Sequence, residues 1–87
     1  MKIDLKHLMT EVEVDSFAPV DFTKEIGNTL HRLAMTIPMA DLARKIFYSE
    51  GEIEISKEEY DEFLSIVKRS YPIAVWSAIE KQVTGNE

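Results

Sequence analysis

The densest group of side chains that could do chemistry is a run of carboxylates in the middle of the chain. Seven of the thirteen residues from 50 to 62 are Asp or Glu, and Lys57 is the one basic residue among them. The seven are Glu50, Glu52, Glu54, Glu58, Glu59, Asp61 and Glu62. A calcium loop alternates Asp or Asn around a central Gly, whereas here Gly51 comes early and Ile53 and Ile55 interrupt the acids. We interpret the run as a solvated acidic face and predict no metal site.

Acid–base catalysis needs a pair of titratable groups whose pKa values are separated by burial in a dry cleft. Glu59 and Glu62 fall at the polar start of an expected helix, where both stay ionised. His7 and His31 are far apart, and His31 is interpreted as a boundary histidine with a satisfied hydrogen bond. The chain has no cysteine, and no GxGxxG, Walker A, GxSxG or HExxH pattern occurs. We predict that the protein is not an enzyme and needs no cofactor.

The charge balance disfavours nucleic acid as a partner. Sixteen acidic residues against ten basic ones give a formal net charge of −6, so binding to phosphates lacks the gain from counterion release. The segments 38–49 and 56–71 could form a helix-turn-helix, but the six residues between them exceed the usual turn. The second segment also opens with Glu58 and Glu59, which repel phosphate. The sequence predicts no nucleic-acid partner.

The length of 87 residues predicts one small domain, 1–87, with 84–87 as a frayed tail. No secretory signal pattern opens the chain, and no run approaches the ~18 apolar residues of a membrane span. We expect a cytoplasmic protein without membrane contact. A chain this short buries only about 60–65% of its unfolded surface. A partner protein or a second copy of the chain would relieve that limit.

The segment 56–71, SKEEYDEFLSIVKRSY, is the best-specified element, and the other elements are expected to pack on it. Ser56 and Glu59 have the spacing of a capping box, and Ile55 and Tyr60 that of a hydrophobic staple. Its apolar residues recur at helical steps and predict one buried face. They are Tyr60, Phe63, Leu64, Val67 and Tyr71.

The fold is predicted to be α+β and mainly α. Four short helices are expected at 22–35, 38–49, 57–70 and 72–83. Asp21 is the expected N-cap of the first helix, and Gly51 is the expected C-cap residue of the second. Gly27 disfavours its helix by about 1 kcal/mol relative to alanine, which indicates close approach of another backbone or tight packing there.

The sheet is expected at the N-terminus. The apolar and polar residues alternate over 2–6 and 11–15, which predicts a β-hairpin of these two strands. The residues 7–10 are interpreted as its turn region, and 16–20, with Pro19, as a linker into the first helix. A short strand at 52–55 is expected beside the hairpin.

Three stretches resemble small acidic proteins encoded by bacteriophages and prophages. They are the opening MKIDL at 1–5, KEIGNTL at 24–30 and ARKIFYSEGEIEI at 43–55. The resemblance covers most of the chain, and it implies a context in which small proteins act by binding, as assembly factors or as inhibitors of host machinery. No functional residue carries over from it.

The leading hypothesis is a non-enzymatic, phage-type accessory protein that binds another protein or a second copy of itself. Its candidate interaction residues are Tyr48, Tyr71 and Trp76, because aromatic residues are enriched at interface hot spots; ordinary core packing is the alternative role for all three. The alternative function is an acidic charge-mimic inhibitor of a nucleic-acid-binding protein. Its candidate residues are Glu58, Glu59 and Glu62, which would present a negative patch.

Overall fold

The computed structural model describes residues 1–85, in which helices predominate over short strands. The helices are α1 (Thr23–Leu33), α2 (Ile37–Phe47), α3 (Lys57–Ser70) and α4 (Ile73–Gly85). The strands are β1 (Lys2–Asp4), β2 (Leu8–Glu13), β3 (Ser16–Val20) and β4 (Glu52–Glu54). The predicted class, α+β and mainly α with four helices, is confirmed.

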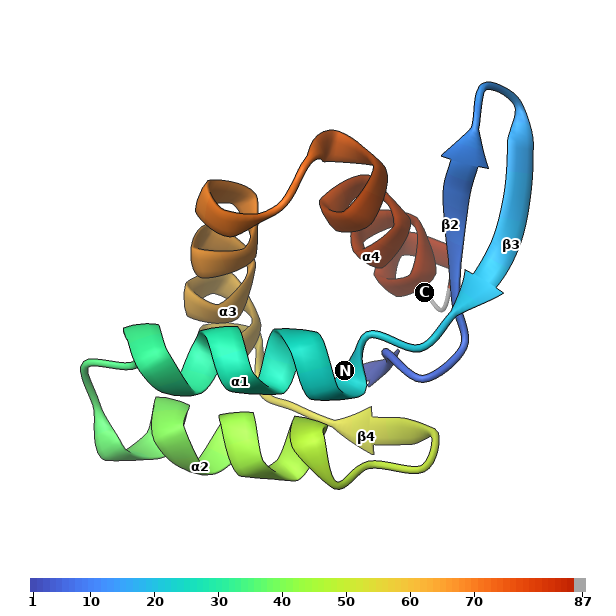
Figure 1. Cartoon of the computed structure of the whole chain (residues 1–87). Helices are drawn as coiled ribbons and strands as arrows, with labels where there is room; N and C mark the ends of the chain where they lie inside the picture. The colour runs from blue at the N-terminus through green and yellow to red at the C-terminus, as the bar shows by residue number, and fades with distance from the viewer. Residues whose placement is uncertain (86–87) are drawn as a thin grey trace.

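The helices α1 and α2 run side by side in opposite directions, and α3 stands across them (Figure 1). Gly27 of α1 lies against Phe47 at the end of α2. A Cβ atom added at Gly27 would lie 2.9 Å from Phe47 Cβ and 3.0 Å from its Cα. The predicted close approach of another backbone to Gly27 is therefore confirmed, and Phe47 supplies that backbone.

The strand pairing differs from the prediction. The first strand, β1, does not pair with the second but lies antiparallel to β4, with Ile3 opposite Ile53. The hairpin is formed instead by β2 and β3, with Leu8 opposite Val20. The predicted pairing of 2–6 with 11–15 is therefore wrong. The partner of β1 is β4, which follows two helices in the chain, and a local pattern of alternating residues cannot reveal such a distant partner. The expected short strand at 52–55 is present as β4.

The hairpin of β2 and β3 turns at Val14 and Asp15. Asp15 has φ 59°, a left-handed conformation that Asp tolerates better than most residues. The Glu11 carboxylate accepts a hydrogen bond from the Asp15 N–H at 2.8 Å, and the ladder is irregular between Glu11 and Glu13. The interpretation of 16–20 as a linker is wrong, because Pro19 is tolerated in a strand whose outer edge is unpaired.

One cluster of buried side chains joins all the helices to β1 and β2. Its largest fully buried members are Phe63, Ile3, Leu5, Leu8, Ile26, Leu30, Met39, Ile46, Ile79 and Val67. The predicted face of α3 is confirmed, since Tyr60, Phe63 and Val67 are buried and Leu64 and Tyr71 pack at the margin. Burial of α3 between the other elements is what gives this small chain a single core.

The N-terminus of α3 carries the predicted capping box. Ser56 Oγ accepts from the Glu59 N–H at 3.1 Å, and a Glu59 carboxylate oxygen accepts from the Ser56 N–H at 2.9 Å. These two bonds satisfy groups that the first turn of a helix leaves unpaired.

Replacing Ser56 with alanine is expected to lower the free energy of unfolding by about 1 kcal/mol, because the Glu59 N–H loses its acceptor. Urea denaturation followed by circular dichroism measures the change. Ser65→Ala, at an exposed position later in the same helix, is the matched control and should not destabilise. Equal losses in the two variants would contradict a role for the cap.

Two other predicted caps are wrong. Helix α1 begins at Thr23 with Phe22 at the N-cap position, so Asp21 lies one residue earlier. Asp21 still acts locally, since its carboxylate accepts from the Thr23 hydroxyl at 2.6 Å and the Thr23 N–H at 2.9 Å, and these bonds lower the pKa of Asp21. Helix α2 ends at Phe47, before Gly51 is reached, and the Ser49 N–H and hydroxyl donate to the Ile46 carbonyl.

The last helix is longer than predicted and reaches Gly85, so the expected frayed tail is helical at 84 and 85, while 86–87 lie outside the described residues.

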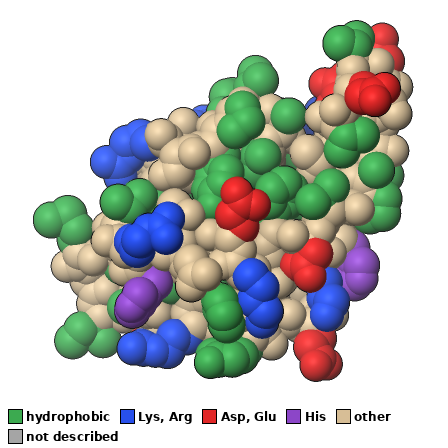
Figure 2. All heavy atoms as spheres, viewed as in Figure 1, with side chains coloured by type: hydrophobic (Ala, Val, Ile, Leu, Met, Phe, Trp, Pro, Cys, Tyr) green, Lys and Arg blue, Asp and Glu red, His purple; other side chains and the backbone are tan. Residues whose placement is uncertain are grey.

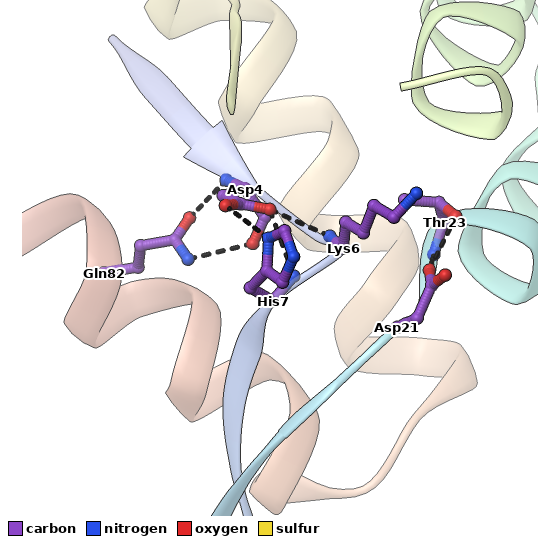
Figure 3. A network of polar contacts seen from close by, with 6 residues as sticks. All are labelled: Asp4, Lys6, His7, Asp21, Thr23 and Gln82. Carbon is purple, nitrogen blue, oxygen red and sulfur yellow. Dashed lines mark hydrogen bonds and ion pairs between the residues drawn. The ribbon is translucent and has the colours of Figure 1, made fainter. Parts of the chain in front are cut away.

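Gln82 of α4 joins this helix to the N-terminal strand β1 (Figure 3). Its side-chain oxygen accepts from the Asp4 N–H at 2.6 Å, and its side-chain nitrogen donates to the Asp4 carbonyl at 2.9 Å. Within residues 1–85, no helix is long and apolar enough to cross a membrane.

Candidate interaction site

Tyr48 is the most accessible of the three candidate aromatic residues. Its side chain follows the last turn of α2 and is 74% exposed. The Tyr48 and Phe47 rings meet edge to face with centroids 5.0 Å apart. Lys24 Nζ lies 4.1 Å from the Phe47 centroid and donates to the Phe47 carbonyl at 2.6 Å. Lys24 thus holds the end of α2, and Tyr48 is free to contact another molecule.

Tyr71 lies at the margin of the core, where α3 meets α1. Its hydroxyl shares a hydrogen bond of 2.8 Å with the Thr29 hydroxyl. Removal from water raises the pKa of Tyr71; the Thr29 bond opposes that rise and Glu25 adds to it. This tyrosine is half-buried and holds two helices together.

The free energy of unfolding is expected to fall as the pH rises above 10.0, the usual pKa of tyrosine, because Tyr71 has a raised pKa in the folded state. A group whose folded pKa is raised stabilises the protein below its unfolded pKa and loses that effect as pH rises through its folded pKa. Tyr60 shares this behaviour, since burial also raises its pKa.

Urea denaturation across this alkaline range should therefore show a smaller loss for Tyr71→Phe than for the wild type. Tyr48→Phe, at an exposed position, is the matched control and should follow the wild type. If Tyr71→Phe also follows the wild type, the raised pKa of Tyr71 has no part in alkaline unfolding.

Trp76 is half-buried on α4 and packs against the core. Lys68 Nζ lies 4.8 Å from its ring centroid, and the same nitrogen lies 3.5 Å from a Glu80 carboxylate oxygen. Tyr48 and Tyr71 line separate open grooves that have Asn28 in common, and Trp76 is not among the lining residues of either. The fold thus brings two of the three aromatic residues near one helix, α1, and leaves Trp76 elsewhere.

The three acidic candidate residues of α3 also differ in their surroundings. Glu58 and Glu62 are exposed on α3, whereas Glu59 is engaged in the capping box. Charge reversal at Glu59 would therefore damage the helix as well as the patch. In residues 1–85, no three or more His, Asp or Glu side chains gather closely enough to hold a metal ion.

The fold places more basic groups beside the acidic run than the sequence indicates. Lys2 Nζ lies 3.8 Å from a Glu52 carboxylate oxygen, and Lys45 Nζ donates to the Glu54 carbonyl at 2.5 Å. Lys57 pairs with Asp61 at 3.7 Å within α3. These cations reduce the negative potential over β4 and the start of α3.

A groove between α1 and α2 is the first feature that the sequence does not reveal. It has a volume of about 300 Å³ and is lined by Gly27, Asn28, His31, Ala43, Arg44, Phe47 and Tyr48. Its floor is apolar, and His31 and Arg44 are exposed. The interpretation of His31 as a boundary histidine with a satisfied hydrogen bond is wrong, because its side chain is exposed and makes no hydrogen bond within residues 1–85. Basic side chains gather over these two helices in the lower part of Figure 2.

The second such feature is the exposed apolar surface of the hairpin of β2 and β3, part of which faces α4. Met9 is 54% exposed and Phe17 is 49% exposed, and both line a shallow hollow against Ala78, Lys81 and Gln82 of α4. Lys81 Nζ lies 5.3 Å from the Phe17 centroid. Two valines near the hairpin turn are exposed as well, with Val12 52% and Val14 89% exposed.

The chain matches no family model, no curated protein and no solved structure.

His7 and Asp4 form a carboxylate–imidazole pair that the sequence does not single out (Figure 3). His7 Nδ1 lies 3.2 Å from one Asp4 oxygen, while the other accepts from the Lys6 N–H at 3.0 Å and the His7 N–H at 3.1 Å. Such bonds from a carboxylate to the following backbone are typical of an Asx turn. The pair therefore shapes the turn from β1 to β2.

Both surfaces that the sequence missed depend on residues distant along the chain. Residues of α1 and α2 make the groove, and its one early signal is Gly27, which indicates where the helices touch. The hairpin surface escapes detection because Phe17 falls in a segment with proline, which reads as a linker. The β-branched and aromatic residues Val12, Val14, Phe17 and Val20 on either side of Asp15 are the signal that could have found it.

Proposed function

We propose that the protein is a phage-type accessory protein that acts by binding another protein molecule, a second copy included, rather than by catalysis. The observation that carries the proposal is the hairpin of β2 and β3, which projects from the body of the molecule (Figure 1). It exposes four large apolar side chains, and these are Met9, Val12, Val14 and Phe17.

Exposed apolar side chains gathered on one projecting element favour contact with protein. Single exposed hydrophobic residues are normal on a surface, whereas Met9 and Phe17 line one hollow together, as apolar side chains of an interaction site do. The hollow between Phe17 and α4 offers a place for a partner side chain, and Lys81 beside it supplies a polar rim. Apolar centres with polar rims are the usual composition of protein interfaces.

The charge-mimic inhibitor remains the second candidate function, and the exposure of Glu58 and Glu62 supports it. The cations Lys2, Lys45 and Lys57 count against it, because they lie beside the acids such an inhibitor would present. The paired substitution Glu58→Lys and Glu62→Lys tests this candidate without disturbing the capping box at Glu59.

The experiment that tests the proposed function is light scattering on sized fractions over a concentration series, followed by capture of partners from host lysate on immobilised protein. The test variant carries Met9→Ser and Phe17→Ser. The matched control carries Met35→Ser and Ile73→Ser. These two apolar side chains lie outside the hairpin, and each has a larger exposed fraction than Met9 or Phe17. We expect association or capture with the wild type and the control, and a loss of at least roughly tenfold with the hairpin variant.

Two results would overturn the proposal. One is a wild-type protein that neither self-associates nor retains any protein beyond a blank support. The other is association that the hairpin variant keeps in full. Loss of binding in the Glu58→Lys, Glu62→Lys variant alone, together with steep weakening by salt, would favour the charge-mimic function instead.

A further inference from the structure

The hairpin turn combines apolar exposure with negative charge. Val14 is 89% exposed at the turn, and Glu13 and Asp15 flank it. The segment 8–20 contains three acidic residues and no Lys or Arg. The Glu11 carboxylate accepts a hydrogen bond from the Asp15 N–H, which restrains the turn and lowers the cost of ordering it on binding.

The groove between α1 and α2 has the opposite character. Residues 23–48 contain four Lys or Arg against two Asp or Glu, whereas the rest of the chain is strongly acidic. Arg44 and His31 line the groove, Gly27 and Ala43 leave its floor shallow and apolar, and Tyr48 stands exposed at one end. The contact of Arg44 with Asp41 at 3.3 Å is exposed on both sides, so a competing carboxylate can replace it at little cost.

The two surfaces lie at opposite ends of the molecule. The hairpin turn points away from α1 and α2 at the upper right of Figure 1, and acidic side chains mark it in Figure 2. The long axis of the molecule is 38 Å. The turn of one copy therefore cannot enter its own groove.

We propose that the hairpin turn of one copy docks in the α1–α2 groove of a second copy. This inference rests on the proposed function and names the partner. Val14 enters the groove over Gly27 and Ala43, and the carboxylates of Glu13 and Asp15 lie beside Arg44 and His31. The contact uses different surfaces on the two copies, so it can repeat head to tail from copy to copy.

The strength of this contact follows from its size and charge. A two-residue turn covers far less area than a stable interface of about 800 Å² per partner, so association is weak and rapid. Its electrostatic part acts between exposed groups and is screened by salt. A low-affinity, salt-sensitive head-to-tail contact is what this geometry predicts.

The test is sedimentation velocity of the full-length protein over a concentration series at low salt, with three variants. Arg44→Glu changes only the groove and Glu13→Lys changes only the turn, so each should stay monomeric where the wild type associates. The third variant carries both substitutions in one chain. A lysine at position 13 of one copy then faces a glutamate at position 44 of the next, so the attraction of this one pair is restored with the signs exchanged, while Asp15 keeps its place beside His31. Association should return to within about threefold of the wild-type constant, a difference of roughly 0.7 kcal/mol.

The matched controls place the same charge changes outside both surfaces. Arg69→Glu and Glu62→Lys lie on the exposed side of α3 and should associate as the wild type does. Circular dichroism should be measured for each variant to establish that it is folded. High salt should shift the wild type and the double variant toward monomer together.

Each outcome decides the inference. Association lost in both single variants and regained in the double variant supports it. A wild-type monomer at every concentration overturns the docking of a second copy, while capture of another protein through Met9 and Phe17 would leave the proposed function standing. If the single variants keep the association, or if the double variant fails to regain it, copies meet through another surface. Either result overturns the inference.

Discussion

Replacing Phe63 with alanine is expected to lower the free energy of unfolding by about 3–5 kcal/mol. Phe63 is a fully buried side chain on the core face of α3, with no exposed area. Its removal costs the transfer of a phenyl ring from water and leaves a cavity that the surrounding helices fill only in part. A domain of this size has a total stability on the order of 5 kcal/mol, so much of the variant should be unfolded at room temperature.

Urea denaturation followed by circular dichroism measures this loss. Leu64→Ala is the matched control, since Leu64 is the next residue in the same helix and only half-buried. The control should lose less than half as much stability, because less apolar area leaves water. Equal midpoints for the two variants would contradict the position of Phe63 at the centre of the core.

The helices could be predicted from the sequence because their signals are local. Ser56 and Glu59 are three residues apart, and the apolar steps of α3 lie within fifteen residues. The structure confirms both. The errors at the helix ends arise from other local hydrogen bonds. Asp21, which precedes the N-cap residue Phe22, accepts from Thr23 at the start of α1. At the end of α2, Ser49 makes the hydrogen bond expected of Gly51. Such errors move a boundary and leave the fold class intact.

The strands could not be paired from the sequence, because register depends on contacts between distant residues. Ile3 and Ile53 are fifty positions apart, and two helices must pack before their strands meet. The true hairpin also lacks an Asn-Gly or Asp-Gly turn; it relies on Asp15 in a left-handed conformation, bonded by Glu11. Alternating residues thus predict that strands exist without saying which strands pair.

The candidate site shows the same division. The aromatic residues Tyr48 and Tyr71 could be selected by type, but only the fold separates an exposed ring from one bonded to Thr29. The groove beside Tyr48 joins His31 to Arg44, which belong to different helices. The net charge of the chain does not reveal this groove, because the basic residues of α1 and α2 are outnumbered by the acidic residues of the rest of the chain.

Replacing Gly27 with alanine is expected to destabilise the protein by about 1–3 kcal/mol, although alanine favours a helix by about 1 kcal/mol. The added methyl group would lie 2.9 Å from Phe47 Cβ and 3.1 Å from its backbone nitrogen. These atoms belong to the last residue of α2 and cannot rotate away as a side-chain end does. The two helices must separate to make room.

Gly51→Ala is the matched control, because no atom lies within 4 Å of a Cβ added there and its φ is not left-handed. That variant should be neutral or slightly stabilised, since alanine restricts the unfolded chain more than glycine does. Thermal and urea denaturation measure both variants. If Gly27→Ala proves as stable as Gly51→Ala, the helices do not meet at Phe47 as closely as described.

The same substitution also reaches the groove, since Gly27 lines its floor. Separation of α1 from α2 moves Arg44 relative to His31 and changes the shape of the floor on which Val14 of a second copy is inferred to dock. Folded Gly27→Ala protein should therefore associate less than Gly51→Ala protein at equal concentration in sedimentation velocity. Loss of stability with unchanged association would separate the packing role of Gly27 from the docking role of the groove.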